Sequence, residues 1–274
     1  MNKILEHFSK ITPGFGEVLL CRLGQHSFII KTGEKLIAVD PYLTADSNRL
    51  IPPLIKPEEF SGFDLICCSH DHGDHIDRPA LSAIAEASPD SIFLVPEAVK
   101  NSITEIPQSR IVGMNDGEFL EIDGVSVKAI AAAHEMLDVT PEGLYPYLGY
   151  IIKCNGVSIY HSGDCCVYEG LLTKLKENLP DIMLLPINGR DAFRLKNDCI
   201  GNMTWQEAVD LAGWSGTEWV IPAHYDMFEG NLADPQLFLD YVEAKYPGLK
   251  TKKLDPGEIF LTGKGMTGKI SPEQ

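Results

Sequence analysis

The sequence contains no Cys-X-X-Cys pair, although it has seven cysteines. Without such a pair, nothing supports a structural zinc ribbon or a thioredoxin-like redox site. Seven is an odd number, and four of the cysteines form the adjacent pairs Cys67-Cys68 and Cys165-Cys166. Neighbouring cysteines rarely bridge each other. We therefore expect reduced thiols in a reducing compartment, the cytoplasm.

Basic residues are also few, with 23 Lys and Arg against 39 Asp and Glu, which gives a formal net charge of −16. A negative field of this kind repels polyanions, so we expect neither nucleic acid nor an anionic membrane as a partner. The sequence has no apolar run near the roughly 20 residues that span a bilayer. Its first residues, MNKILEHFSK, lack the apolar core of a signal peptide.

Hydrophobic residues make up 44% of the sequence, enough for a full core without disulfide bonds. Short apolar runs and amphipathic segments alternate, which predicts a mixed α/β fold. The predicted strands are 17–23, 27–31, 36–40, 63–68, 92–95, 147–153, 157–160, 182–186, 219–222 and 259–261, with a hairpin over 118–131. The predicted helices are 78–87, 97–102, 169–178, 204–214 and 235–245.

The two halves of the chain share this strand and helix pattern, and no linker or fixed-period repeat separates them. Two sheets inside, each covered by helices outside, would bury the apolar faces of both halves. The sequence therefore predicts a four-layered αββα sandwich that forms a single domain over residues 1–274.

The densest cluster of reactive side chains is the segment HDHGDH, which begins at His70. It follows the apolar run FDLICC, residues 63–68, which is typical of a strand buried on both faces. Three of the eight histidines of the chain lie in these six residues, and such clustering is rarely accidental. Imidazole and carboxylate without thiolate form the ligand set of Zn, Mn or Fe in hydrolytic or oxygen-handling sites.

A metal site needs further ligands, and three candidates follow other predicted strands: His134, Asp164 and His224. Each is weak alone, because a single histidine after a strand is more often hydrogen-bonded in the core and a single aspartate usually caps a turn. Together they share one structural position, the end of a strand. The sequence thus indicates a polynuclear metal site at the strand ends.

This pattern resembles the metallo-β-lactamase superfamily, whose loop motif HxHxDH is matched by His70, His72, Asp74 and His75. The resemblance implies two divalent metal ions, Zn or Mn, with Fe possible. It implies that His70, His72 and His134 hold the first ion. Asp74, His75 and His224 would then hold the second, with Asp164 and a hydroxide bridging both ions.

Within the superfamily, the chain is similar to the L-ascorbate-6-phosphate lactonase (UlaG-like) branch. The similar segments are SHDHGDHID from Ser69, IYHSGD at 159–164, GNMT at 201–204 and VIPAHYDMFEGNLADP at 220–235. That lactonase lacks a histidine at the position of His134, which indicates a relative with a more complete site and another substrate. Lactonase relatives form oligomers, so the resemblance also implies a possible homo-oligomer.

Two adjacent cations lower the pKa of a bridging water towards 7 and so supply hydroxide at neutral pH. We expect this hydroxide to attack a lactone or ester carbonyl, with Asp74 and Asp164 as the catalytic carboxylates. The favoured function is a metal-dependent hydrolase that opens a cyclic ester of a sugar acid or sugar phosphate. A small phosphodiesterase and a non-catalytic metal-binding protein are the alternatives.

Six further residues are candidates for positioning the ligands or the substrate. Asp71 would fix the tautomer of a ligating histidine, and His26 and His161 would face the site. Arg190 and Arg194 would bind a small anionic substrate, because a guanidinium matches phosphate or carboxylate with two hydrogen bonds. Tyr225 would line the pocket. For each of these residues, an ordinary structural role is the alternative.

Overall fold

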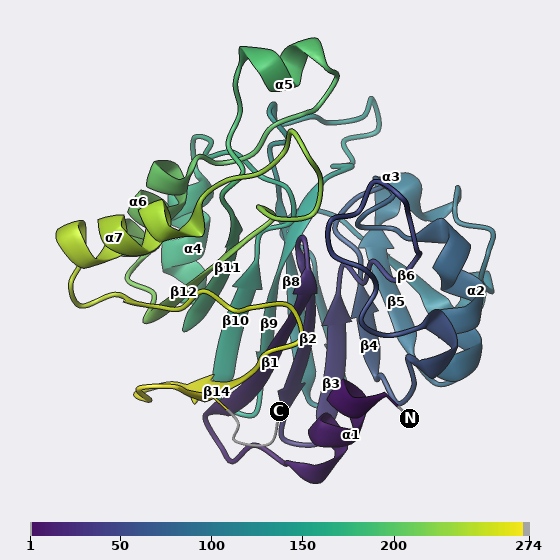
Figure 1. The fold of residues 1–274 in the computed structure, drawn as a ribbon. Coiled ribbons are helices and arrows are strands. Elements are labelled where there is room, and N and C mark those ends of the chain that lie inside the picture. The colour runs from purple at the N-terminus through teal and green to yellow at the C-terminus, as the bar shows by residue number, and fades with distance from the viewer. Residues whose placement is uncertain (1, 271–274) are drawn as a thin grey trace.

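The computed structural model describes residues 2–270, which form two packed β-sheets (Figure 1). The first has eight strands in the order β15-β14-β1-β2-β3-β4-β5-β6. These strands are β1 (Glu17–Gly24), β2 (Ser27–Thr32), β3 (Lys35–Val39), β4 (Leu65–Cys67), β5 (Ile92–Pro96), β6 (Ile111–Met114), β14 (Ile259–Gly263) and β15 (Lys269–Ile270). Strands β1 to β3 form the antiparallel meander that their turns predict, and β3 to β6 are parallel.

The second sheet has seven strands in the order β13-β12-β11-β10-β9-β8-β7. They are β7 (Phe119–Ile122), β8 (Val125–Ala131), β9 (Leu148–Cys154), β10 (Val157–His161), β11 (Ile182–Pro186), β12 (Trp219–Ala223) and β13 (Lys250–Thr251). The hairpin predicted over 118–131 is present, and a second hairpin joins β9 to β10. At the second, Asn155 and Gly156 have φ angles of 49° and 82°, which two-residue hairpin loops of this kind require.

Helices cover the outer face of each sheet. The helices α1 (Lys3–Lys10), α2 (Arg78–Ala87) and α3 (Glu97–Lys100) pack on the first sheet, and α4 (Leu171–Asn178), α6 (Trp205–Ser215) and α7 (Pro235–Lys245) pack on the second. A third core, built from both sheets, lies between them. Figure 1 shows α2 on one side of the strands and α4, α6 and α7 on the other. The predicted αββα sandwich is confirmed.

The sequence did not predict β6, α1 or α5 (Ala192–Lys196). All three are short, so they carry too few residues for a periodic signal. Helix α1 has eight residues, and it is held by the Asn2 side chain, which accepts a hydrogen bond from the backbone N–H of Ile4, and by the buried Leu5 and Phe8. The predicted helix at 204–214 is present as α6, and Thr204 and Glu207 form a reciprocal capping box at its start.

Strand β4 ends earlier than predicted. The backbone N–H of Ser69 donates to the Asp40 carboxylate at 2.7 Å instead of continuing the strand pairing, and the chain then enters the histidine-rich loop. No helix within residues 2–270 is long and apolar enough to cross a membrane.

Candidate metal centre

The predicted ligands lie at the carboxyl ends of four strands. The loop from His70 to His75 follows β4, His134 follows β8, Asp164 follows β10 and His224 follows β12. In open α/β sheets the carboxyl ends of the strands form the common place for a ligand site. The fold thereby brings together residues that are up to 154 positions apart in the sequence.

The side chains form two clusters of three ligands each. Ring nitrogens of His70, His72 and His134 lie within 4.8 Å of one another, and His70 Nε2 and His72 Nδ1 are 2.9 Å apart. Asp74, His75 and His224 form the second cluster by the same measure. These are the two ligand sets that the resemblance implied.

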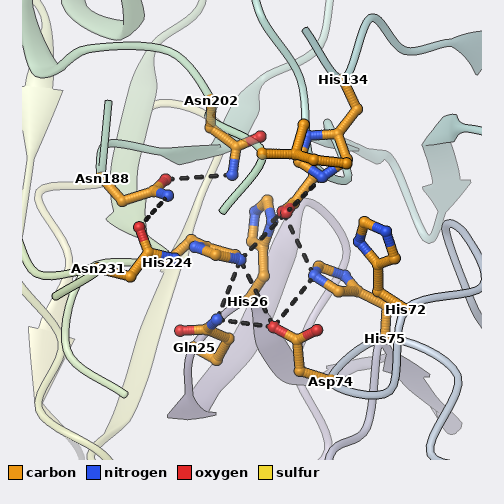
Figure 2. Close-up of polar contacts among 12 residues, drawn as sticks. Gln25, His26, His72, Asp74, His75, His134, Asn188, Asn202, His224 and Asn231 are labelled. Atoms are coloured by element: carbon orange, nitrogen blue, oxygen red, sulfur yellow. Dashed lines mark hydrogen bonds and ion pairs between the residues drawn. The ribbon is translucent and has the colours of Figure 1, made fainter. Parts of the chain in front are cut away.

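Asp164 lies between the clusters. Its Oδ1 is 3.3 Å from Nε2 of His75, and its Oδ2 is 3.1 Å from Nε2 of His224 and 3.6 Å from Nε2 of His134. In Figure 2 the rings of these three histidines converge on a common centre. Oδ2 thus faces one ligand of each cluster, His134 and His224, while Oδ1 faces His75 of the second cluster. A carboxylate in contact with both clusters has the placement that a bridging ligand needs.

In two of the histidines, His75 and His134, a hydrogen bond at one ring nitrogen leaves the other nitrogen free to bind metal. Nδ1 of His75 lies 2.6 Å from the buried Asp40 carboxylate, and Nδ1 of His134 lies 3.2 Å from the carbonyl oxygen of Gly201. Carboxylate and carbonyl oxygens only accept, so each Nδ1 carries the proton and each Nε2 keeps its lone pair. Such partners are the usual support of metal-binding histidines.

Unpaired buried atoms test whether the residues fit a metal. Among residues 2–270, Nε2 of His75 and Oδ1 of Asp164 are buried without a hydrogen-bond partner. A buried polar atom that is left unpaired is costly and needs an explanation. A divalent cation explains both atoms, since each presents a lone pair to the same centre. The residues therefore fit a metal site.

The electrostatics of the two clusters differ. Burial, reinforced by the nearby His75, lowers the pKa of His70 well below its ordinary value, and burial also lowers the pKa of His72 and His134. Burial opposes charge on His224 too, but Asp164 and Asp74 prevail and raise its pKa to about 9. The first cluster is thus a set of imidazoles without a carboxylate of its own, whereas the second places carboxylates beside its imidazoles.

Two residues at the site have left-handed backbone conformations and were missed by the sequence analysis. Gln25 (φ 51°) donates from Nε2 to Oδ2 of Asp74 at 2.7 Å, and this Nε2 lies 3.0 Å from Nε2 of His224. Asp40 (φ 47°) supports His75. Non-glycine residues with positive φ are uncommon and gather at functional sites. Neither residue belongs to the motifs described in the sequence analysis, so no motif pointed to them.

The histidines His26 and His161 lie beneath the metal centre. Both are fully buried, with ring centroids 3.9 Å apart. Nε2 of His161 donates to the backbone carbonyl of His26, and its Nδ1 accepts from the N–H of Gly163, so both nitrogens are used. Nδ1 of His26 is 3.8 Å from Oδ1 of Asp164. Their position is below the ligands, where they support Asp164 and its loop.

Asp71 and Tyr225 have other partners in the structure than the sequence analysis expected. Asp71 is part-exposed and forms an ion pair with Arg78, with 2.7 Å between Oδ2 and Nη2, so it does not orient a histidine. Asp40, which is nearer in space although distant in sequence, takes that role. Tyr225 is buried with its ring against the guanidinium of Arg22, at 4.8 Å from the ring centroid. It is absent from the cavity wall.

The two arginines of the loop after β11 already have protein acceptors. Both terminal nitrogens of Arg190 donate to Glu207 at 2.7 Å. Arg194 pairs with Asp191 and donates to the carbonyl of Leu232 at 2.8 Å. Neither guanidinium lines the cavity at the ligands, so the structure does not support the prediction that they bind an anion.

A cavity of about 360 Å³ opens onto the ligands. It is lined by Gln25, His72, Gly73, Asp74, His134, Asp164, Asp198, Cys199, Ile200, His224, Phe228 and Asn231. Ligands of both clusters contribute to this wall. A small molecule in the cavity would therefore meet the metal centre directly.

Comparison with known proteins places the chain in a family. Residues 35–225 match the β-lactamase superfamily domain. A "UPF0173 metal-dependent hydrolase" of Pyrococcus abyssi is 32% identical, with 86% of this chain and 96% of the relative covered. A protein of the same description from Pelotomaculum thermopropionicum is 34% identical over the same shares of both chains.

Solved structures agree with this assignment. A metallo hydrolase of Ignicoccus hospitalis is 25% identical, with a TM-score of 0.70 over 90% of this chain and 99% of the other. CmlA, a diiron β-hydroxylase of Streptomyces venezuelae, is 16% identical and shares the fold alone, with a TM-score of 0.70 over 92% of this chain and 55% of the other. The metal-ligand clusters and these relationships together show that the chain belongs to the UPF0173 metal-dependent hydrolases of the metallo-β-lactamase superfamily.

Proposed function

We propose that this metal-dependent hydrolase opens a cyclic ester, a lactone, at the centre formed by its two ligand clusters. The observation that carries the proposal is the placement of Asp164 between His134 of the first cluster and His75 and His224 of the second, in the wall of an open cavity. We propose His70, His72 and His134 for one divalent ion, and Asp74, His75 and His224 for the other. When bound, two such ions supply hydroxide at neutral pH and polarise a carbonyl.

The residues around the ligands hold this geometry in place. Asp40 keeps Nε2 of His75 directed at the centre, and the Gly201 carbonyl does the same for His134. Gln25 holds the Asp74 carboxylate at the cavity wall. We propose that Asp74 takes the proton of the attacking hydroxide and passes it to the leaving oxygen, since its carboxylate lies at this wall beside Gln25. Asp164 would contact both ions, because it lies between the clusters.

The finer proposal names a sugar-acid or sugar-phosphate lactone, as in the L-ascorbate-6-phosphate lactonase (UlaG-like) branch. The similar segments support it, because they include the ligand-bearing loops at Ser69, 159–164 and 220–235. Binding of a small anionic substrate has less support, since Arg190 and Arg194 are held by Glu207 and Asp191. The finer proposal therefore has support for the bond that is cleaved, a lactone ester, and less support for a negative charge on the substrate.

We also propose that the protein works in the cytoplasm, without nucleic-acid or membrane partners. All seven cysteines are free thiols, as in a reducing compartment. The net charge of −16 disfavours polyanions. The resemblance to the lactonase branch also supports the proposal of a homo-oligomer.

Steady-state hydrolysis by protein loaded separately with Mn and Zn tests the proposal. The substrates are L-ascorbate 6-phosphate, a neutral γ-lactone and bis(4-nitrophenyl) phosphate. We expect lactone opening that is lost in His72→Ala and kept in Asp71→Asn, whose side chain belongs to the same loop but pairs with Arg78. Cleavage of the phosphodiester alone would establish the phosphodiesterase alternative. Metal binding without turnover of any substrate would favour a non-catalytic metal-binding protein.

A further inference from the structure

A second hollow adjoins the cavity at the metal centre. It has a volume of about 400 Å³ and is lined by His134, Glu135, Met136, Leu195, Asp198, Cys199 and Ile200. Four of these residues, His134, Asp198, Cys199 and Ile200, also line the cavity at the ligands. The two spaces therefore share a wall, with the ligand His134 at their junction.

The outer part of this second hollow is apolar and open to solvent. Met136 is 72% exposed, Leu195 on α5 is 69% exposed and Ile200 is 41% exposed. Figure 1 shows α5 at the top, apart from the helices that cover the second sheet. Large apolar side chains that stay exposed beside a polar site indicate a binding surface, because their contact with water is unfavourable.

The charges around both spaces are negative. Within the described part of the chain, no Lys or Arg lines either space, whereas Asp74, Asp164 and Asp198 line the metal-facing cavity. Glu135, in the second hollow, accepts a hydrogen bond from the backbone N–H of Gly201 at 2.9 Å. Away from the metal centre, a negatively charged group would find no guanidinium or ammonium partner among these lining residues.

We infer that the second hollow binds the apolar chain of a neutral lactone or ester while the carbonyl lies at the metal centre. The four shared lining residues carry this inference, since they place the second hollow directly beside the ligand His134, within reach of the chain of a molecule bound at the metal centre. The reaction in this inference rests on the proposed function, but the binding of an alkyl chain beside the metal does not. Met136, Leu195 and Ile200 are the residues that set the preference for chain length.

Two metal-chelating probes test the binding without any turnover. Acetohydroxamate and octanohydroxamate present the same chelating group, and octanohydroxamate carries six more methylenes. Each methylene removed from water contributes about fourfold when fully buried, and less in an open groove. By calorimetry with Zn-loaded protein, we expect octanohydroxamate to bind at least about tenfold more tightly than acetohydroxamate.

The variants Leu195→Ser and Met136→Ser should reduce this preference at least about threefold, since each removes apolar contact area. Their affinity for acetohydroxamate should stay unchanged, which shows that the metal centre is intact. Leu237→Ser is the matched control, because Leu237 on α7 is 46% exposed and lines neither space. This control should keep the full preference.

Equal affinities for the two hydroxamates in the wild type, or an undiminished preference in both serine variants, would overturn the inference. The wild type could also form a dimer that dissociates in Leu195→Ser, while this variant still prefers octanohydroxamate. That result would overturn the inference and identify the apolar residues as a subunit interface. The proposed function is tested separately, by hydrolysis of neutral γ-lactones of four to ten carbons. If all of these lactones open at equal rates, the apolar binding site is contradicted but the proposed reaction is not. If the hydroxamates show a chain-length preference but no lactone opens, the proposed reaction is contradicted but the apolar binding site is not.

Discussion

Asp40 accepts a hydrogen bond from Nδ1 of His75 at 2.6 Å, and the two residues are 35 positions apart in the sequence. The same carboxylate accepts from the backbone N–H and the hydroxyl of Ser69, both at 2.7 Å. Asp40 therefore joins the end of β3 to the loop that carries the HxHxDH motif. Through this one buried side chain, the first sheet sets the direction in which His75 presents Nε2.

The first prediction concerns Asp40→Asn. Asparagine tolerates the φ of 47° at this position better than most residues, so the backbone should stay in place. The amide is a weaker acceptor for the proton of Nδ1, so we expect the affinity for the second metal ion to fall about 10- to 100-fold. Metal titration by calorimetry measures this, with thermal melting as the folding control. Unchanged affinity would show that Asp40 does not support the ligand.

The second prediction concerns Gln25→Ala, which removes the amide that donates to Asp74. A hydrogen bond to a charged group contributes about 1.5–3 kcal/mol, so we expect occupancy of the second cluster to require about 10- to 150-fold more metal. Gln236→Ala is the matched control, because this glutamine is exposed and donates to Asp240 on the same helix. The prediction fails if both variants titrate like the wild type.

The third prediction compares two glycines beside the ligands. Gly163 has a φ of 58°, and a Cβ there would lie 2.4 Å from the carbonyl oxygen of Leu148 and 2.8 Å from Cβ of Ser69. Gly163→Ala should therefore destabilise the protein by about 1–3 kcal/mol and displace Asp164. At Gly73, inside the motif, a Cβ meets nothing within 4 Å, so Gly73→Ala should fold normally. Urea denaturation compares them, and equal stabilities would contradict the packing argument.

The fourth prediction concerns the ion pair below the site. Arg22 is fully buried and meets Asp226 with two hydrogen bonds of 2.6 and 2.9 Å. Asp226→Ala leaves the guanidinium without its carboxylate, which typically costs about 3–5 kcal/mol. We expect a lower denaturation midpoint in urea, with a milder loss in Asp226→Asn. A midpoint within error of the wild type would mean that the carbonyl of Leu254, which also accepts from Arg22, is sufficient.

The fifth prediction concerns thiol reactivity. Burial raises the pKa of Cys165 to about 12 and that of Cys166 to about 11. Because the thiolate is the reactive form, these thiols should resist iodoacetamide at pH 8, and their labelling should increase only as the pH rises towards these values. Cys154 and Cys199, the two half-buried thiols, should react before the buried ones. Peptide mass mapping of the folded protein measures the order, and early labelling of Cys165 would contradict it.

The sequence by itself determined the features that depend on neighbouring residues. Hairpin turns such as Asn155-Gly156 follow from the backbone conformations that these residues tolerate, and the cap of α6 follows from Thr204 and Glu207 three positions apart. The spacing of His70, His72, Asp74 and His75 is likewise local, so the motif identified the loop. The alternation of buried strands and amphipathic helices was sufficient to predict the αββα layers.

Only the tertiary structure decided which polar groups pair with one another. Asp71 lies next to His70 in the sequence, yet it pairs with Arg78, while the distant Asp40 supports His75. Arg190 was expected to bind an anion, but the packing of α6 brings Glu207 within 2.7 Å of it. A hydrogen bond depends on distances of a few ångströms in space, and the sequence does not contain those distances until the strands have paired and the layers have packed.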